Sequence, residues 1–293
     1  MNAARAMTPR ASLVREAVAA ACIAELKALK PGNVHVFADG HGMTVADFRK
    51  SSQVTAEVLG TPGLSVGDRI LRAVEATMQT VGCNTNLGIL LLCAPLAQAA
   101  HLGHLGPGLR AGLKRVLAAF DVEDARLAYR AIRRADPAGL GASDRFDVAE
   151  TPRVTLLEAM REAQGRDRIA AQYANDFADV FGLGLVRFRD ALSRWNRPEW
   201  VPTAVYLGFL SRFPDSHLVR SFGVEAAERV RRRAAVLDRQ FQESRDPAAM
   251  RGGLMEFDVE LKACEQNPGT SADLTVASLL AARLADIDET AAG

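Results

Sequence analysis

The chain has 293 residues, 48% of them hydrophobic and 24% charged, with 36 Lys and Arg against 35 Asp and Glu. This composition is that of a folded globular protein and excludes a chain that is disordered throughout. The formal net charge of +1 creates no large field of one sign, so general affinity for nucleic acid or for an anionic membrane is not expected.

The balance of residue types predicts helices. The sequence contains 51 Ala but only 6 Ile and 3 Tyr. Alanine loses no side-chain entropy in a helix, whereas sheets are enriched in β-branched and aromatic residues. An all-β fold is therefore excluded.

The cysteines and the apolar segments indicate a cytoplasmic protein. The four cysteines (22, 83, 93 and 264) show no CxxC pairing and no histidine at zinc-finger spacing, so neither a disulfide framework nor a structural zinc site is expected. The N-terminus lacks the apolar stretch of a signal peptide, and the most apolar segment, Leu87 to Ala100, is too short to span a bilayer. We expect a soluble, cytoplasmic chain with reduced thiols.

Apolar residues recur at helical spacing from the first residues onward. The first helix is predicted over residues 11–29, where Lys30-Pro31-Gly32 ends it, and residues 33–43 form a loop. Helices then start at Thr44 and Ser65, each followed three residues later by an Asp that suits a capping box. Further helices are predicted over residues 85–101, 107–120, 122–135, 153–164, 167–181, 183–195, 199–213, 224–244, 247–265 and 271–287.

The segment from residue 85 to residue 101 is apolar on nearly all sides, which is typical of a buried helix, with a possible kink at Pro95. Residues 136–152 form a long polar loop. The sequence thus predicts an all-α fold, a single compact multi-helix domain around a central apolar helix. We expect residues 10–287 to form the helical catalytic domain, with flexible ends at residues 1–9 and 288–293.

Four segments combine Gly or Pro turns with polar residues at helix ends. They are KPGNVHVFADGHGM (30–43), VGCNTNLG (81–88), PDSHLVRSFG (214–223) and NPGTSADL (267–274). The unpaired N–H groups of a helix N-terminus form a natural anion site. Each segment taken alone is equally explained by capping.

The order and content of these segments resemble the triphosphoribosyl-dephospho-coenzyme A synthase family, all-helical enzymes that serve the prosthetic groups of citrate lyase and malonate decarboxylase. The KPG stretch, the Asn84-Thr85 pair with Gly88, and the SADL stretch match the family pattern well, and residues 215–223 match it loosely. There are two departures. Asn86-Leu87 stands where the family has His-Lys, and the His41-Gly42-Met43 loop lacks the adjacent Asp, although Asp39 is near.

The resemblance implies transfer of the 5-triphosphoribosyl group of ATP to a hydroxyl of 3′-dephospho-coenzyme A, with release of adenine and with Mg²⁺ as cofactor. Such chemistry requires cationic and N–H contacts to the triphosphate, a carboxylate beside an oxocarbenium-like ribose, and proton carriers. The predicted substrate-binding residues are Lys30, Gly32, Asn33, Asn84, Thr85, Asn86, Gly88, Arg220, Gly269 and Ser271. The predicted catalytic residues are Glu75, Asp39, His35, His41 and Asp273, and the predicted metal ligands are Glu75 and Asp147.

Alternatives to this reading stay open. The Asn86-Leu87 departure leaves room for phosphoribosyl transfer to a different acceptor, such as a pterin coenzyme precursor. A non-catalytic helical scaffold would use the same Gly and Pro motifs only as caps. An all-helical ADP-ribosyl hydrolase ranks last, because it would need more paired acidic residues at helix ends. We expect ATP and a coenzyme-like small molecule as partners, neither nucleic acid nor membrane, and a homodimer as one open oligomeric state.

Overall fold

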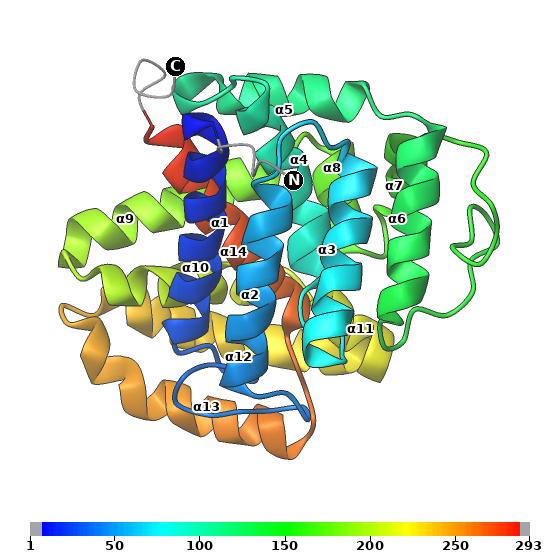
Figure 1. Ribbon diagram of the computed structural model, residues 1–293. Helices are drawn as coiled ribbons and strands as arrows, with labels where there is room; N and C mark the ends of the chain where they lie inside the picture. Colours follow the sequence, from blue (N-terminus) through cyan, green and yellow to red (C-terminus); the bar gives the residue numbers. More distant parts are fainter. Residues whose placement is uncertain (1–7, 288–293) are drawn as a thin grey trace.

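The computed structural model describes residues 8–287 of the chain, which form one compact all-α domain without a β-strand (Figure 1). Its α-helices are α1 (Pro9–Lys27), α2 (Val45–Leu59), α3 (Val66–Val81), α4 (Leu87–His101), α5 (Leu109–Ala118), α6 (Val122–Ala135), α7 (Leu156–Ala163), α8 (Arg168–Ala174), α9 (Leu185–Trp195), α10 (Val201–Arg212), α11 (Ser216–Phe222), α12 (Val224–Glu243), α13 (Arg251–Ala263) and α14 (Gly269–Ala285). The flexible ends expected at residues 1–9 and 288–293 lie outside the described residues, except that Thr8 caps α1 and Pro9 begins it.

Two helices share the centre of the bundle. Twelve of the fifteen residues of α4 and thirteen of the seventeen residues of α14 are buried. The two helices pack against each other, and α14 also packs against α1 and α10 (Figure 1). The predicted central apolar helix is confirmed as α4, and α14 joins it because its apolar residues also cover nearly all of its circumference.

Of the two capping boxes that the sequence predicts, the first forms fully and the second in part. Thr44 and Asp47 make a reciprocal capping box at the start of α2, and Ser65 accepts a hydrogen bond from the backbone N–H of Asp68 at the start of α3. Gly82 ends α3 in the left-handed region at φ 77°, which favours glycine. These local signals explain why the helix bounds in the first hundred residues agree closely with the prediction.

Three details of the helix prediction were wrong. Residues 216–222 form the short helix α11. Seven residues are too few to show a helical period in the sequence. Residues 167–181 do not form one helix, because α8 ends at Ala174 and a π-helical turn over Val180–Gly184 leads into α9. The last helix begins at Gly269, two residues earlier than predicted, since the side chain of Asp215, the residue before α11, caps its first turn.

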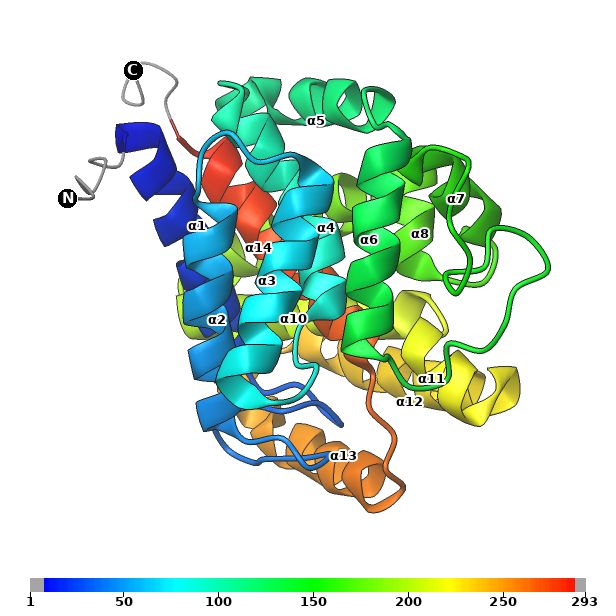
Figure 2. The same ribbon diagram turned by 45° about the vertical axis from the view of Figure 1, so that its right-hand side comes forward.

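The chain brings distant segments together at one end of the bundle. The loop after α1, helix α13, and the loop from α13 into α14 lie at the lower end in Figures 1 and 2, with α11 beside them. The first turn of α14 and the C-terminal end of α1 therefore share this end. None of the helices within residues 8–287 has the length and apolarity needed to cross a membrane.

Candidate active site

A chain of buried polar side chains joins the loop after α1 to the loop before α14. Lys30 Nζ donates hydrogen bonds to the carboxylate of Glu25 and, at 2.7 Å, to Asn33 Oδ1. Asn33 Nδ2 donates in turn to Asn267 Oδ1 at 2.8 Å. Two of the four segments singled out in the sequence are thereby joined across more than two hundred residues.

Lys30 and Glu25 form a pair without access to solvent. Lys30 is 0% exposed and Glu25 is 3% exposed. Burial lowers the pKa of Lys30 and raises that of Glu25, and the opposite charge of each partner opposes these shifts. Because Lys30 has no free path to a ligand, this arrangement favours a positioning role over the direct substrate contact that the sequence suggested.

Helix α13 fastens the loop that follows Lys30. Asp258 accepts hydrogen bonds from the backbone N–H of Gly32 at 2.8 Å and from Lys262 Nζ at 3.0 Å. Gly32 has φ 81°, and a Cβ there would come within 2.8 Å of the Gln266 carbonyl oxygen, so only glycine fits.

His35 also contacts Asp258 and so helps to hold the loop after α1. Its Nε2 lies 3.3 Å from Asp258 Oδ1, and its Nδ1 accepts from the backbone N–H of Phe37, which assigns the ring proton to Nε2. The ring is 0% exposed, and burial lowers its pKa. A neutral, enclosed imidazole supports the loop rather than carrying protons to a substrate.

Asp215 joins the starts of α11 and α14. Its Oδ1 accepts from the backbone N–H groups of His217 and Leu218, and its Oδ2 accepts from Ser271 N at 2.7 Å and Ser271 Oγ at 2.8 Å. The predicted substrate ligand Ser271 thus has its hydroxyl committed to a buried carboxylate.

Asp273 extends from the first turn of α14 onto the first turn of α4. A Cβ at Gly88 would lie 2.0 Å from Asp273 Oδ2, so the carboxylate occupies the space that any other residue at position 88 would fill. Burial, followed by the charges of Asp215 and Glu25, raises the pKa of Asp273 well above its ordinary value. The positive charge of Arg220 opposes this rise.

The segment before α4 is held by its own amides. Asn84 Oδ1 accepts from the backbone N–H of Leu87 at 3.1 Å, while Asn86 Nδ2 donates to Thr55 and Thr77 on α2 and α3. Leu87 lies in the hydrophobic core. Both residues of the Asn86-Leu87 departure are therefore internal packing residues. In contrast, Thr85 Oγ1 is buried without a hydrogen-bond partner among residues 8–287.

Arg220 and His217 stand on α11 beside Asp273. Arg220 Nη1 donates to Asp167 Oδ2 at 2.5 Å, and its positive charge opposes the rise in the pKa of Asp273. His217 Nδ1 lies 3.0 Å from the Asn267 carbonyl oxygen. We call the region where α4, α11 and α14 begin, with Gly88, Asp215, His217, Arg220, Gly269 and Asp273, the junction site.

The structure does not bring every predicted residue to the junction site. Asp39 is exposed and accepts from the backbone N–H of Val45, and His41 Nε2 lies 2.7 Å from the Gly32 carbonyl oxygen. Glu75 faces Arg130 at 3.9 Å on the outer side of α3. Asp147 accepts backbone hydrogen bonds within its own loop.

The two predicted metal ligands, Glu75 and Asp147, thus have separate partners. Within residues 8–287, no three His, Cys, Asp or Glu side chains form a group that could hold a metal ion. Any metal would need most of its ligands from another source.

Sequence reasoning missed several residues that build the site. Glu25, Asp215, His217, Asp258 and Asn267 all contribute hydrogen bonds to it. His217 and Asn267 lie inside segments that the sequence had singled out. Glu25 and Asp258 lie within helices, where a carboxylate at helical spacing is indistinguishable from a solvated surface acid.

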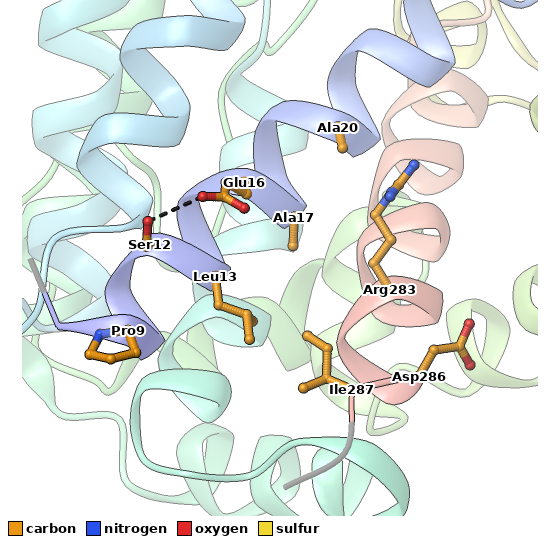
Figure 3. A pocket seen from close by; sticks show the side chains of 9 residues that line it. All are labelled: Pro9, Ser12, Leu13, Glu16, Ala17, Ala20, Arg283, Asp286 and Ile287. Carbon is orange, nitrogen blue, oxygen red and sulfur yellow. Dashed lines mark hydrogen bonds between the residues drawn. The ribbon is translucent and has the colours of Figure 1, made fainter. Parts of the chain in front are cut away.

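A wide pocket lies at the other end of α1 and α14. It has a volume of about 720 Å³, and Leu13, Glu16 and Arg283 are among the side chains around it (Figure 3). It contains none of the predicted site residues. A narrower cavity between α1, α2 and α4 is lined by Glu25 and Asn86, and so adjoins the polar network around Lys30.

Comparison with known proteins gives a family and a fold. The family described as CitG, ATP:dephospho-CoA triphosphoribosyl transferase, matches residues 11–291. A crystal structure from Archaeoglobus fulgidus, provisionally described as a triphosphoribosyl-dephospho-CoA synthase, superposes with a TM-score of 0.62 at 24% identity, covering 83% of this chain and 99% of that one. No curated protein matches the sequence significantly. At this identity the structural likeness speaks for the fold alone.

Proposed function

Because the chain belongs to the ATP:dephospho-CoA triphosphoribosyl transferase family, we propose that the junction site is its active site. The chain is a transferase of coenzyme biosynthesis, which moves the 5-triphosphoribosyl group of ATP to 3′-dephospho-coenzyme A and releases adenine. The observation that carries the location is the contact of Asp273 with Gly88, where the starts of α4 and α14 meet.

The reaction sets four physical demands. An acceptor hydroxyl oxygen bonds to C1′ of the ribose while the bond from C1′ to the adenine nitrogen breaks. The leaving adenine takes that electron pair and needs a proton, and the hydroxyl must lose one. The ribose gains positive character between these events, and the triphosphate must be held throughout.

Asp273 is suited to donate the proton that the leaving adenine needs. Its raised pKa keeps the carboxyl protonated further toward neutral pH than an ordinary Asp, which is the state of a general acid. The side chain is partly exposed, so the carboxyl can face a ligand. After giving up its proton, the carboxylate stabilises the positive ribose beside it.

The triphosphate fits the starts of α4 and α14. Asn84 and Asp215 already cap Leu87 and Ser271, but the other first N–H groups of each helix have no partner within the helix, and the macrodipole favours negative charge there. Arg220, partly exposed next to Asp273, adds a cation. Of the predicted substrate ligands, Gly88 and Gly269 contribute backbone, while Gly32, Asn33 and Lys30 hold the neighbouring loop.

The charge balance favours Mg²⁺ as a companion of ATP. Four acidic side chains, Glu25, Asp167, Asp215 and Asp273, stand close to one another, with the cations Lys30, Arg220 and Lys262 near them. A polyphosphate entering such surroundings needs further positive charge. The described side chains do not fit a dedicated magnesium site, so the ion would be held mainly by phosphate oxygens and water.

The acceptor, 3′-dephospho-coenzyme A, remains the best supported. The Asn86-Leu87 departure is the reason to consider a pterin-like acceptor. Both residues, however, pack inside the protein, and neither shares the catalytic role proposed for Asp273. A cytoplasmic location, suggested by four unpaired cysteines, and a homodimer both stay predictions.

Adenine release tests the proposal. Wild-type protein with ATP, Mg²⁺ and 3′-dephospho-coenzyme A should release adenine only when the acceptor is present. Asp273→Asn should lower kcat by about 10²- to 10⁴-fold, the usual loss for a general acid, while the exposed Asp286→Asn control on the same helix keeps wild-type turnover. Equal activity in all three proteins would place the chemistry elsewhere.

A further inference from the structure

We propose that His217 is the general base of the junction site, accepting the proton of the acceptor hydroxyl at its Nε2 atom. The proposal rests on the proposed function, which leaves that proton without a destination. His35 does not fill the role because it is enclosed, and His41 belongs to the loop before α2, where its Nε2 lies 2.7 Å from the Gly32 carbonyl oxygen, rather than to the junction site.

The position of the ring proton in His217 is set by its partner. A carbonyl oxygen only accepts hydrogen bonds, so Nδ1, 3.0 Å from the Asn267 carbonyl oxygen, must carry the hydrogen. In the neutral ring this leaves the lone pair on Nε2. Asn267 is itself held by Asn33, so the orientation of the ring is tied to the same network that holds Lys30.

His217, on α11, packs against the face of α14 that carries Asp273. A Cβ at Gly269 would come 3.1 Å from His217 Nδ1. Gly269 and Asp273 are four residues apart on α14, so they share a face about 6 Å apart along the axis. The imidazole and the carboxyl therefore meet the same face of α14 at backbone positions about one helical turn apart.

The charges around His217 suit a base. Burial is the largest influence and lowers its pKa, which keeps the free ring neutral at physiological pH. Arg220 on its own helix and His41 from the loop before α2 act in the same direction, while Asp215 opposes them. Once the ring is protonated, the carboxylate of Asp215 stabilises the imidazolium.

The proton balance then closes. The acceptor O–H bond breaks as its oxygen bonds to C1′, and that proton passes to His217 Nε2. The bond from C1′ to adenine breaks with its electron pair going to adenine, which takes the proton of Asp273. The products are the ribosylated acceptor, neutral adenine, imidazolium and carboxylate, and solvent exchange of one proton restores the two groups.

Substitution of His217 by Asn tests the assignment. The Asn Nδ2 group reproduces the Nδ1–H donor to Asn267 but offers no Nε2 base. His217→Asn should keep ATP affinity by calorimetry, lose about 10²- to 10⁴-fold in kcat, and lose the acidic limb of its pH–rate profile. His104→Asn, at a histidine outside the junction site, is the matched control. It should keep wild-type kcat and the acidic limb of the pH–rate profile.

Chemical rescue separates a catalytic from a structural role. Added imidazole should restore turnover to His217→Ala at least 10-fold, increasingly as pH rises through the pKa of imidazole. A folded His217→Asn protein with wild-type kcat and an unchanged acidic limb, or a His217→Ala protein that imidazole does not rescue, overturns the assignment. If wild-type protein releases no adenine with this acceptor, the proposed function itself fails.

Discussion

Asp273 Oδ2 lies where a side chain on Gly88 would begin, 2.0 Å from the position of a Cβ on that residue. The two residues are 185 positions apart in the sequence and come from the two central helices. The absence of a side chain at position 88 is what lets the carboxyl of α14 reach the first turn of α4.

Gly88→Ala should therefore impair turnover more than stability. The added methyl group must displace Asp273 or the α4 backbone, which misplaces the catalytic carboxyl, so we expect kcat to fall by about 10²-fold, the loss typical of a 1 Å misplacement. Steady-state kinetics and thermal melting measure the two effects. Gly252→Ala is the matched control, because nothing lies within 4 Å of its Cβ position. Unchanged kcat in Gly88→Ala would contradict the contact's role.

The buried Lys30–Glu25 pair should make single substitutions costly. Lys30→Met leaves the Glu25 carboxylate buried without its cation, a change that typically costs about 3–5 kcal/mol of unfolding free energy. The double variant Lys30→Met with Glu25→Leu should recover much of this loss, because no unpaired charge remains. Urea unfolding of both variants and the parent gives the comparison. A single variant as stable as the parent would show that the pair is open to solvent.

Asp273→Asn should stabilise the fold as pH rises. The pKa of Asp273 is higher in the folded protein than its ordinary value of 3.8. The folded state thus holds its proton more tightly than the unfolded state, and stability from this group is lost as pH rises through the folded pKa. The difference in Tm between Asp273→Asn and the parent should be small near pH 4 and should grow in favour of the variant toward neutral pH. A difference that shrinks over this range would mean the opposite shift.

Mg²⁺ should bind only together with nucleotide. The described residues hold no group of three metal-ligating side chains, and the carboxylates of Asp215 and the neighbouring Asp167 already accept hydrogen bonds from protein donors. Calorimetry with Mg²⁺ alone should give no saturable heat, whereas a titration in the presence of ATP should. Glu75→Gln should leave both titrations unchanged, because Glu75 pairs with Arg130 on the outer side of α3. Tight binding of Mg²⁺ to the free protein would contradict this account.

The local part of the fold was predictable from the sequence, and the tertiary part was not. Thr44, Ser65 and Gly82 contact only neighbouring residues, so the helix ends that they form can be predicted without knowledge of the fold. The start of α14 depends on Asp215, which lies 56 residues away, and no local pattern reports such a cap.

The candidate site divides in the same way. The four segments were identified because turns and caps are local, and Asp273 was named with them. Glu75 and Asp147 were assigned by residue type and family order, and their sites in the fold are ordinary surface contacts. The role of His217 cannot be predicted from the sequence, because it depends on contacts with Asn267 and Gly269 that only the tertiary structure creates.

The most direct test is to locate the nucleotide. A crystal structure with Mg²⁺ and a slowly reacting ATP analogue should place the triphosphate at the starts of α4 and α14 and the ribose beside Asp273. Density for the nucleotide in the wide pocket between Glu16 and Arg283, with the junction site free of ligand, would contradict the account.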